Sequence, residues 1–405
     1  MSEKHWRRRA GLYIGGQFLS NFGSMLVQFA VTWYVTLETD SGATMTWLIL
    51  AAMLPTVLIM PFAGVWADRH NRKYLVNGAD SAIALVTLIL ALLFISGQRS
   101  IGLLLVAAVL RALGQGIQTP AASALIPQLV PAEHLTRFNG IQNTLQAVTA
   151  FLSPMAAGAV LSILPLEFIF FIDVATAVVG IAIVFFCVKV DKIERKAPVE
   201  TGARAYLSDM RQGLGLVKRT KWLQWWLGDV GVFSFLAAPL VLLTPLLVAR
   251  SFGDDVWRLT LCELIFSAGA IVAGVGMSVW GGLKNKAHTM IVSTFLIAAT
   301  TIFLGLVPNF WSYLVVLFIS GLALPMFNIP SMTILQTKVA PDMMGRVFSL
   351  MNILSGLAMP LGMVFFGPLG DRVPIEALLI ATGGAMLVNA LALTRAKSLI
   401  AAGAG

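Results

Sequence analysis

The fold is decided by Pro120-Ala-Ala-Ser-Ala-Leu-Ile-Pro-Gln-Leu-Val-Pro131 and its counterpart, Pro330-Ser-Met-Thr-Ile-Leu-Gln-Thr-Lys-Val-Ala-Pro341. Each stretch ends an apolar segment, and a basic residue and a second apolar segment with an internal proline follow each of them. Equivalent segments at equivalent places predict two parallel repeats related by an axis along the membrane normal. A substrate path would then run between the repeats, near the middle of the bilayer.

The chain is too apolar and too poor in charge for a soluble fold. Hydrophobic residues make up 58% of its 405 residues and charged residues only 12%, whereas soluble domains carry about 25% charged residues. The mean hydropathy is +0.85. Membrane proteins are the class that fits this composition.

A helix crosses a bilayer with about 20 mostly apolar residues, and such segments recur along the whole chain. Twelve spans are predicted, over 11–37, 43–66, 75–96, 101–126, 136–162, 166–188, 222–248, 257–280, 289–307, 310–335, 344–370 and 374–394. We therefore expect an all-α membrane protein with twelve transmembrane helices in two six-helix, pseudosymmetric bundles. The bundles would comprise residues 1–190 and 222–405.

A polar linker over 191–221 separates the two predicted bundles. Within it, Leu207, Met210, Leu214 and Val217 recur three and four residues apart, with basic residues on the other faces. This spacing predicts an amphipathic helix that lies on the cytoplasmic membrane surface.

The net charge of +9 reflects topology. Of the 28 Lys and Arg residues, 23 fall in segments on one side of the predicted membrane, and the other loops hold only Arg99, Arg250, Arg258 and Arg372. Basic residues near helix ends are retained on the cytoplasmic side. We therefore expect a multi-pass protein with both termini in the cytoplasm, and no nucleic-acid partner.

Catalytic and metal-binding motifs are missing from the sequence. Cys187 and Cys262 both lie in predicted spans, and the four His form no cluster with metal-ligand spacing. There is no glycine-rich phosphate loop and no pairing of a nucleophile with a base. We expect neither an enzyme nor a bound cofactor or metal.

The loop after the second predicted span reads Gly64-Val-Trp-Ala-Asp68-Arg69-His-Asn71-Arg72-Lys73. Gly64 would let a neighbouring helix approach closely, and Asp68 could accept hydrogen bonds from the amides at a helix N-terminus. The basic residues Arg69, Arg72 and Lys73 satisfy the cytoplasmic rule. From the residues alone, the loop could equally be a charged turn.

The pattern Gly-x-x-x-Asp-Arg-x-x-Arg-Lys resembles the signature of the major facilitator superfamily between its second and third helices. The resemblance implies a gating loop that latches the two halves together, with Asp68 against the start of the eleventh helix near Met344. The family usually has Gly where this chain has Asn71. Asn is among the residues that visit left-handed backbone angles, so this replacement is expected to be tolerated and the latch to be kept.

Two more segments resemble motifs of the same family. Arg111-Ala-Leu-Gly114-Gln115-Gly116 places an arginine inside the fourth span, where a charge is costly and faces a bundle interior or a cavity; the resemblance implies a role in proton transfer, and structural pairing is the alternative. Ala150 to Gly158 keeps Pro154 of the antiporter signature in the fifth helix but replaces most of its glycines. Antiport is therefore a weaker expectation, and a proline kink with close packing is the alternative.

Four acidic residues within or near spans are candidates for proton coupling. A carboxylate in such a place can load a proton on one side of the membrane and release it on the other. Asp80 and Asp229 lie close to the inner ends of their helices, where we expect them to be solvated. Asp173 and Glu263 lie about two turns inside the outer ends, so they are the favoured pair, with a buried hydrogen-bond network as the alternative.

Over nearly its whole length the sequence resembles the macrolide-efflux type of bacterial major facilitators, close to the enterobactin-exporter branch. The resemblance lies in 64–80, 111–131, 137–158, 344–350 and 358–360. It implies a secondary active exporter in the bacterial inner membrane that exchanges an amphipathic small molecule, such as a macrolide or another drug, for protons by alternating access. The expected partners are that substrate, protons and the lipid bilayer, and we expect a monomer.

The abundance of 17 Met, 24 Phe and 10 Trp favours a large hydrophobic substrate, because Met and aromatic side chains repack around guests of different shape. A lysophospholipid or siderophore carrier of the same fold is the first alternative. A membrane sensor without transport activity is a more distant one, and it would tolerate the loss of Asp173 and Glu263.

Overall fold

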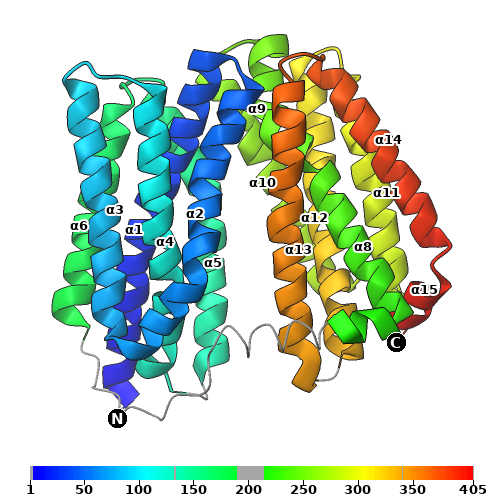
Figure 1. Cartoon of the computed structure of the whole chain (residues 1–405), viewed down its shortest axis with the longest axis horizontal. Coiled ribbons are helices and arrows are strands. Elements are labelled where there is room, and N and C mark those ends of the chain that lie inside the picture. The colour runs from blue at the N-terminus through cyan, green and yellow to red at the C-terminus, as the bar shows by residue number, and fades with distance from the viewer. Residues whose placement is uncertain (1–2, 132–133, 189–213, 340, 405) are drawn as a thin grey trace. The chain divides into compact units, whose positions relative to one another are not determined.

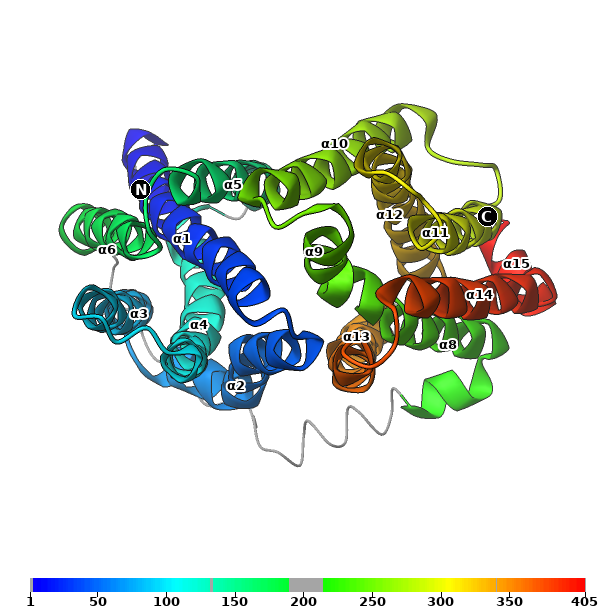
Figure 2. The same cartoon turned by 90° about the horizontal axis from the view of Figure 1, so that it is seen from above.

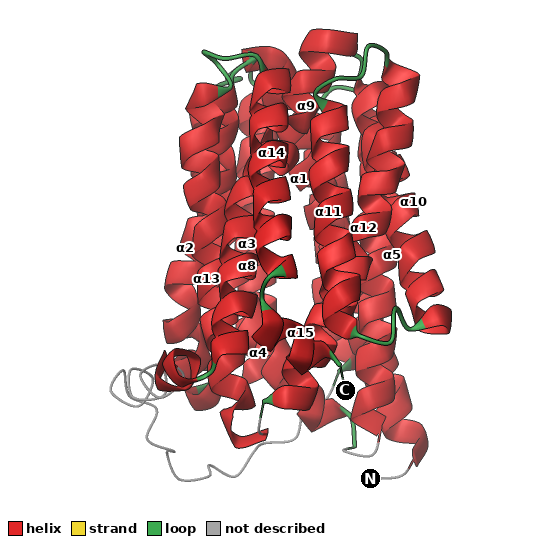
Figure 3. Ribbon diagram, turned by 90° about the vertical axis from the view of Figure 1, so that its right-hand side faces the viewer, coloured by secondary structure: helices red, strands yellow, loops and turns green. Residues whose placement is uncertain are grey.

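All regular secondary structure in the described part of the chain is helical (Figure 3). The computed structural model describes residues 3–131, 134–188, 214–339 and 341–404 (Figure 1). Helices satisfy their own backbone hydrogen bonds, which is the condition for crossing an apolar phase. The contacts divide the chain into two compact units, Met1–Glu38 with Trp47–Ala197, and Thr39–Thr46 with Pro198–Gly405.

The first unit contains six long helices (Figure 2). They are α1 (Glu3–Thr39), α2 (Gly42–Arg69), α3 (Arg72–Ile95), α4 (Ile101–Leu129), α5 (Leu135–Leu161) and α6 (Glu167–Ala182), and a π-helical turn, η2 (Ile183–Cys187), extends α6. Helix α3 packs against both α4 and α6. The core at one end of this unit includes Val76 of α3, Leu125 of α4 and Val184 of η2, all fully buried.

The second unit repeats this organisation with one interruption. Its helices are α8 (Lys221–Leu236), α9 (Ala238–Phe252), α10 (Val256–Trp280), α11 (Lys286–Leu304), α12 (Phe310–Lys338), α13 (Pro341–Leu369), α14 (Ile375–Thr394) and the short α15 (Lys397–Gly403). Helix α12 packs against α10 and α11, and α13 packs against α8. Leu223, Trp226, Met290 and Leu335 are fully buried in the core of this unit.

The all-helical membrane fold predicted from the sequence is confirmed. In the described residues, eleven helices are long and apolar enough to cross a membrane. Helix α1, with 37 residues, is long enough as well, but Gln17, Asn21 and Gln28 lower its hydropathy. The span predicted over 222–248 lies within one of these stretches, Lys221–Phe252. The helix in this stretch is interrupted at Ala237, with Pro239 in the first turn of α9.

The repeated proline stretches occupy matching places in helices of equal length. Helices α4 and α12 each have 29 residues and continue through their internal prolines. Helix α4 ends before Pro131 because the residue before a proline is pushed out of helical geometry, and Val130 accordingly has φ −119° and ψ 128°. The predicted linker and most of its amphipathic helix lie outside the described residues.

Glycines set how closely α1 can approach α6 within the first unit. A Cβ atom at Gly180 of α6 would lie 2.6 Å from the carbonyl oxygen of Gly16 in α1, and one at Gly16 would lie 3.0 Å from the carbonyl oxygen of Gly180. Small residues at a crossing let two helix backbones come into contact, as is common between helices in membranes. This crossing brings the polar face of α1 close to Asp173 of α6.

A polar cluster belongs to the second unit and includes the first turn of α2. The Asp371 carboxylate, in the turn after α13, accepts hydrogen bonds from the Gly42 amide (2.6 Å), the Ala43 amide (3.0 Å) and the Ser41 hydroxyl (2.9 Å). Arg250 pairs with Asp40 at 2.8 Å and lies 3.5 Å from Asp371. Asp371 therefore supplies acceptors for amides that a helix N-terminus leaves without partners.

Candidate functional site

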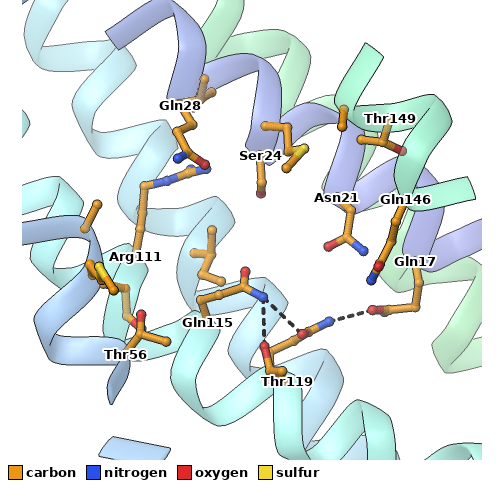
Figure 4. A pocket seen from close by; sticks show the side chains of 18 of the residues that line it. Gln17, Asn21, Ser24, Gln28, Thr56, Arg111, Gln115, Thr119, Gln146 and Thr149 are labelled. Atoms are coloured by element: carbon orange, nitrogen blue, oxygen red, sulfur yellow. Dashed lines mark hydrogen bonds between the residues drawn. The ribbon is translucent and has the colours of Figure 1, made fainter. Parts of the chain in front are cut away.

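A large cavity lies within the first unit (Figure 4). Its volume is about 1150 Å³, and α1, α2, α4 and α5 supply most of its lining. The apolar part of the lining includes Phe18, Met25, Leu48, Ile49 and Met53. Ligand pockets typically measure about 300–1,000 Å³ and are mostly apolar with a few placed polar groups, so this cavity has room for a large guest.

The polar part of the lining comes from amides and hydroxyls. In α1, Gln17, Asn21, Ser24 and Gln28 follow one another at helical spacing and face the cavity (Figure 4). Helix α4 contributes Gln115, Gln118 and Thr119, and α5 contributes Gln142, Asn143, Gln146 and Thr149. None of the described residues that line the cavity is acidic, and Arg111 is its one cationic side chain.

Arg111 forms a buried ion pair at the wall of this cavity. Its Nη1 lies 2.6 Å from Asp173 Oδ2, and the Asp173 side chain is only 1% exposed. The Thr87 hydroxyl lies 3.0 Å from the same oxygen and also accepts from Arg111, while the Ser24 hydroxyl donates to Asp173 Oδ1 at 3.3 Å. Four helices, α1, α3, α4 and α6, are thereby joined around one compensated pair of charges.

A second polar chain runs from the cavity to a buried carboxylate. Gln118 Nε2 donates to Gln17 Oε1 at 2.5 Å, and Gln17 Nε2 donates to Asp80 Oδ2 at 3.2 Å. At its cavity end, Gln115 Nε2 donates to Thr119 Oγ1 at 3.1 Å and to Gln118 Oε1 at 3.4 Å (Figure 4). Asp80 is 6% exposed, so this chain of hydrogen bonds connects the cavity lining with a buried carboxylate.

Comparison with known proteins assigns these features to a family. The sequence profile described as "Major Facilitator Superfamily" matches residues 13–363. The chain belongs to this superfamily. It is 27% identical over 389 residues to macrolide efflux protein A of Streptococcus pyogenes, covering 96% of this chain and 95% of that protein. It is 28% identical over 316 residues to macrolide efflux protein A of Enterococcus faecalis, covering 78% and 97%.

Solved structures of major facilitators share the fold at low sequence identity. The nucleoside transporter NupG has a TM-score of 0.71 and 13% identity, with 96% of this chain and 99% of that chain covered. A bacterial homologue of the iron transporter ferroportin, solved in an inward-facing state, also has a TM-score of 0.71, with 16% identity and coverage of 96% and 98%. These likenesses support the twelve-helix fold.

Two of the four candidate acids lie in surroundings that differ from the expectation. Asp80 and Asp229, expected to be solvated, are 6% and 2% exposed. Distance along a helix from its end does not measure burial, because Gln17 of α1 covers Asp80 and Asn389 of α14 donates to Asp229 Oδ1 at 2.6 Å. Glu263 on α10 is only partly buried.

The loop between α2 and α3 is described only in part. The side chains of Gly64, Asp68 and Arg69 lie outside the described set, so the latch near Met344 stays a prediction. Arg72 donates to the carbonyl oxygens of Ala67 (3.0 Å) and Ala124 (2.8 Å), and Lys73 donates to that of Phe185 (2.7 Å). These two basic residues therefore bind carbonyl oxygens at the ends of neighbouring helices.

Asn71 does not use the left-handed conformation that Asn tolerates. Its backbone angles are φ −69° and ψ 113°, and its side chain accepts from the Lys73 amide at 3.0 Å as the N-cap of α3. Asn is among the best N-cap residues, so capping rather than backbone freedom accounts for it. Among the described residues, Asp40 is the one non-glycine with positive φ.

The polar, uncharged side chains that line the cavity were not predicted from the sequence, because the site candidates within the spans were charged residues. Gln17, Asn21, Ser24 and Gln28 are spaced by four, three and four residues, which places them on one face of a helix. A polar stripe on an apolar, membrane-length helix indicates a face turned to a cavity or to other helices. That spacing was therefore a usable signal in the sequence.

Proposed function

We propose that this major facilitator exports amphipathic small molecules, with macrolides as the first candidates, in exchange for protons by alternating access. The observation that carries the proposal is the cavity of about 1150 Å³, whose lining combines Phe and Met side chains with amides and hydroxyls. Such a surface suits a bulky guest that has an apolar body and many oxygen atoms. The likeness to two macrolide efflux proteins supports the same substrate class.

The proposal also covers the setting of the protein. It acts in the bacterial plasma membrane as a monomeric carrier rather than an enzyme, with both termini in the cytoplasm. The distribution of Lys and Arg supports this orientation. Fusions of a reporter that is active only in the cytoplasm, placed after Gly405 and in the 305–309 loop, test it: activity at the C-terminus but not in the loop is the expected result.

The test of transport compares two tryptophan substitutions in α4. Ala108 lines the cavity, whereas Val106, two residues away in α4, is 57% exposed and does not belong to the lining. Cells that express the wild type should accumulate less erythromycin than empty cells, and a protonophore should abolish the difference. Ala108→Trp should raise accumulation towards that of empty cells, and Val106→Trp should not.

Three other outcomes of these transport assays would contradict parts of the proposal. If erythromycin, other antibiotics and dyes all accumulate as in empty cells, the drug class is wrong, and labelled lysophospholipid and ferric or iron-free siderophore are the next cargoes to assay. If none of them moves and loss of Asp173 and Glu263 has no effect on the cell, the sensor alternative gains. If Ala108→Trp exports normally, the cavity is not the substrate site.

A further inference from the structure

We propose that Asp80 is the carboxylate that binds the coupled proton, and that Gln118 and Gln17 connect it to the substrate in the cavity. The inference rests on the proposed function and specifies how the same cavity is coupled to proton movement. It differs from the expectation drawn from the sequence, which favoured Asp173 and Glu263.

The two buried carboxylates of the first unit differ in how their charge is compensated. Asp173 is held by Arg111 at 2.6 Å, so a proton on Asp173 would leave the arginine charge buried without a partner, which is costly. In the described part of the chain, no Lys or Arg forms an ion pair with Asp80, and Gln17 is its hydrogen-bond donor. Asp80 can therefore gain and lose a proton without breaking an ion pair.

In the described part of the chain, two titratable groups interact with Asp80. On α1, Tyr13 lies close enough to interact with it electrostatically, and on α6 so does Asp173. The charge of Asp173 is balanced by Arg111 of α4. The other contact from α1 is the neutral amide of Gln17. Protonation of Asp80 therefore disturbs the surrounding interactions less than protonation of Asp173 would.

The amides between Asp80 and the cavity point in one direction. Gln115 donates to Gln118, Gln118 donates to Gln17, and Gln17 donates to Asp80. Hydrogen bonds in such a chain polarise one another, so a change at one end alters the strength of the others. A substrate oxygen that accepts from Gln115 competes with Gln118 for that donor, and the effect reaches Asp80 through two amides.

Asn77 provides a route for the proton. It is one turn before Asp80 on α3, 5% exposed, and neither its side-chain oxygen nor its nitrogen has a hydrogen-bond partner among the described residues. Buried polar groups of this kind are commonly satisfied by ordered water. Water at Asn77 would connect Asp80 with the end of α3 that begins at Arg72.

The chemical step is a proton transfer. One O–H bond forms at a carboxyl oxygen of Asp80 as one O–H bond of a hydronium ion in the water path breaks, and release reverses both changes. The protonated form binds Gln17 less strongly than the carboxylate does, because hydrogen bonds to a charged acceptor are the stronger ones. Substrate and proton therefore favour different states of the same amide chain, as exchange requires.

Erythromycin binding to the purified protein as a function of pH tests this coupling. In the wild type, lowering the pH should weaken binding by about tenfold, within the range of ~5–150-fold found for coupled sites. Asp80→Asn should bind erythromycin with no dependence on pH, and in liposomes it should keep erythromycin exchange while losing accumulation driven by a pH gradient. Gln118→Met should flatten the pH dependence with Asp80 intact.

The matched control is Glu167→Gln, which makes the same change from carboxyl to amide at another buried acid of the first unit, paired with Arg99 at 2.5 Å. It should keep the pH dependence of the wild type. The inference is overturned if accumulation driven by a pH gradient persists in Asp80→Asn. It is also overturned if Asp229→Asn loses this accumulation while Asp80→Asn keeps it, because the proton would then bind in the second unit.

A second readout separates this inference from the proposed function. If the wild type neither binds nor exchanges erythromycin, the proposed substrate is wrong, but infrared difference spectra between acidic and alkaline samples still report on Asp80. A carbonyl stretch of a protonated carboxylic acid that changes with pH and disappears in Asp80→Asn is expected. Spectra that are identical in the wild type and Asp80→Asn would overturn the inference whatever the cargo.

Discussion

Arg111 and Asp173 illustrate how one buried pair can hold four helices of a membrane protein together. Because the two charges compensate each other, their cost in an apolar surrounding is tolerated only as long as both are present. Serine and threonine hydroxyls complete the site by reaching the remaining carboxylate lone pairs. The pair is therefore a structural centre beside the cavity, and its Arg111 also lines the cavity.

Removing one partner of the Arg111–Asp173 pair should destabilise the folded protein much more than removing both partners. Asp173→Leu leaves Arg111 unpaired, and we expect a loss of about 3–5 kcal/mol in the free energy of unfolding. The double variant Asp173→Leu with Arg111→Met should recover most of that loss, because no buried charge is left. Thermal unfolding in detergent measures both, and equal midpoints for the single and double variants would contradict the assignment.

The sequence identified Arg111 and Asp173 as candidates but did not predict that they pair. A charge inside a span is rare enough to be recognised by itself, and depth along a helix then suggested Asp173 and Glu263 as the active acids. Depth does not specify which face of the helix a residue occupies or what covers it. For that reason the burial of Asp80 and the part played by Gln17 could be learned only from the packed structure.

At the scale of helices, glycine positions that look alike in sequence have different consequences. Gly180 has no room for a Cβ atom, because the carbonyl oxygen of Gly16 would lie 2.6 Å from it, whereas Gly78 in α3 has no atom within 4 Å. Gly180→Ala should therefore destabilise the protein by about 1–3 kcal/mol through overpacking. Gly78→Ala should be neutral or stabilise it by up to about 1 kcal/mol.

Thermal unfolding of the two variants side by side tests this contrast. The matched pair controls for the general effect of replacing glycine by alanine in a helix, which favours the folded state. A midpoint for Gly180→Ala at or above that of Gly78→Ala would mean that α1 and α6 are not in close contact at this point.

The first turn of α2 should make stability depend on pH. Partial burial by itself would raise the pKa of Asp371, but the amides of Ala43 and Gly42, the Ser41 hydroxyl and the Arg250 guanidinium together lower that pKa below its ordinary value. The resulting stabilisation is complete above the ordinary carboxyl pKa of about 4 and is lost as the pH falls through the lower, folded value. Asp371→Asn should remove this pH-dependent stabilisation.

The measurement is the thermal midpoint at a series of pH values. Between about pH 5 and about pH 3 the midpoint of the wild type should fall more than that of Asp371→Asn, and the two curves should converge at the acid end. Parallel curves would show that the hydrogen bonds of Asp371 do not depend on its charge.

Among the helices, hydropathy predicted the membrane spans but not the interruption within one of them. The proline repeats located α4 and α12, since both proline spacing and segment length are carried by the sequence itself. The predicted span over 222–248 was divided at Ala237, because a membrane-length apolar run does not show whether its helix is continuous. The capping role of Asn71 was not predicted, because it depends on the local backbone angles and on a side-chain hydrogen bond to the Lys73 amide.

At the scale of the whole molecule, each unit has a core of its own. The core residues Val76, Leu125 and Val184 all belong to the first unit, and Trp226, Met290 and Leu335 to the second. Cutting the chain between Ala197 and Pro198 therefore leaves both cores complete. Cells that express residues 1–197 and 198–405 as separate chains should export erythromycin at a reduced rate, and cells with either piece alone should not.

Accumulation of erythromycin in the three strains gives the comparison, with membrane content of each piece measured in parallel. Export by the second piece alone would show that the cavity of the first unit is dispensable. No export from the pair, with both pieces present in the membrane, would mean that covalent continuity through 189–213 is required.

The hydrogen bond from the Gly42 amide to Asp371 also bears on how the protein is made. Its two partners are separated by 329 residues, and at about 5–20 residues per second a ribosome needs on the order of tens of seconds to pass from one to the other. During that interval the Ser41 side chain, which accepts from the Thr44 amide, provides a local cap for the first turn of α2. The hydrogen bonds at the N-terminus of α2 are thus completed only after α13 and Asp371 have been synthesised. The order in which these groups are translated therefore differs from the order in which they reach their final contacts.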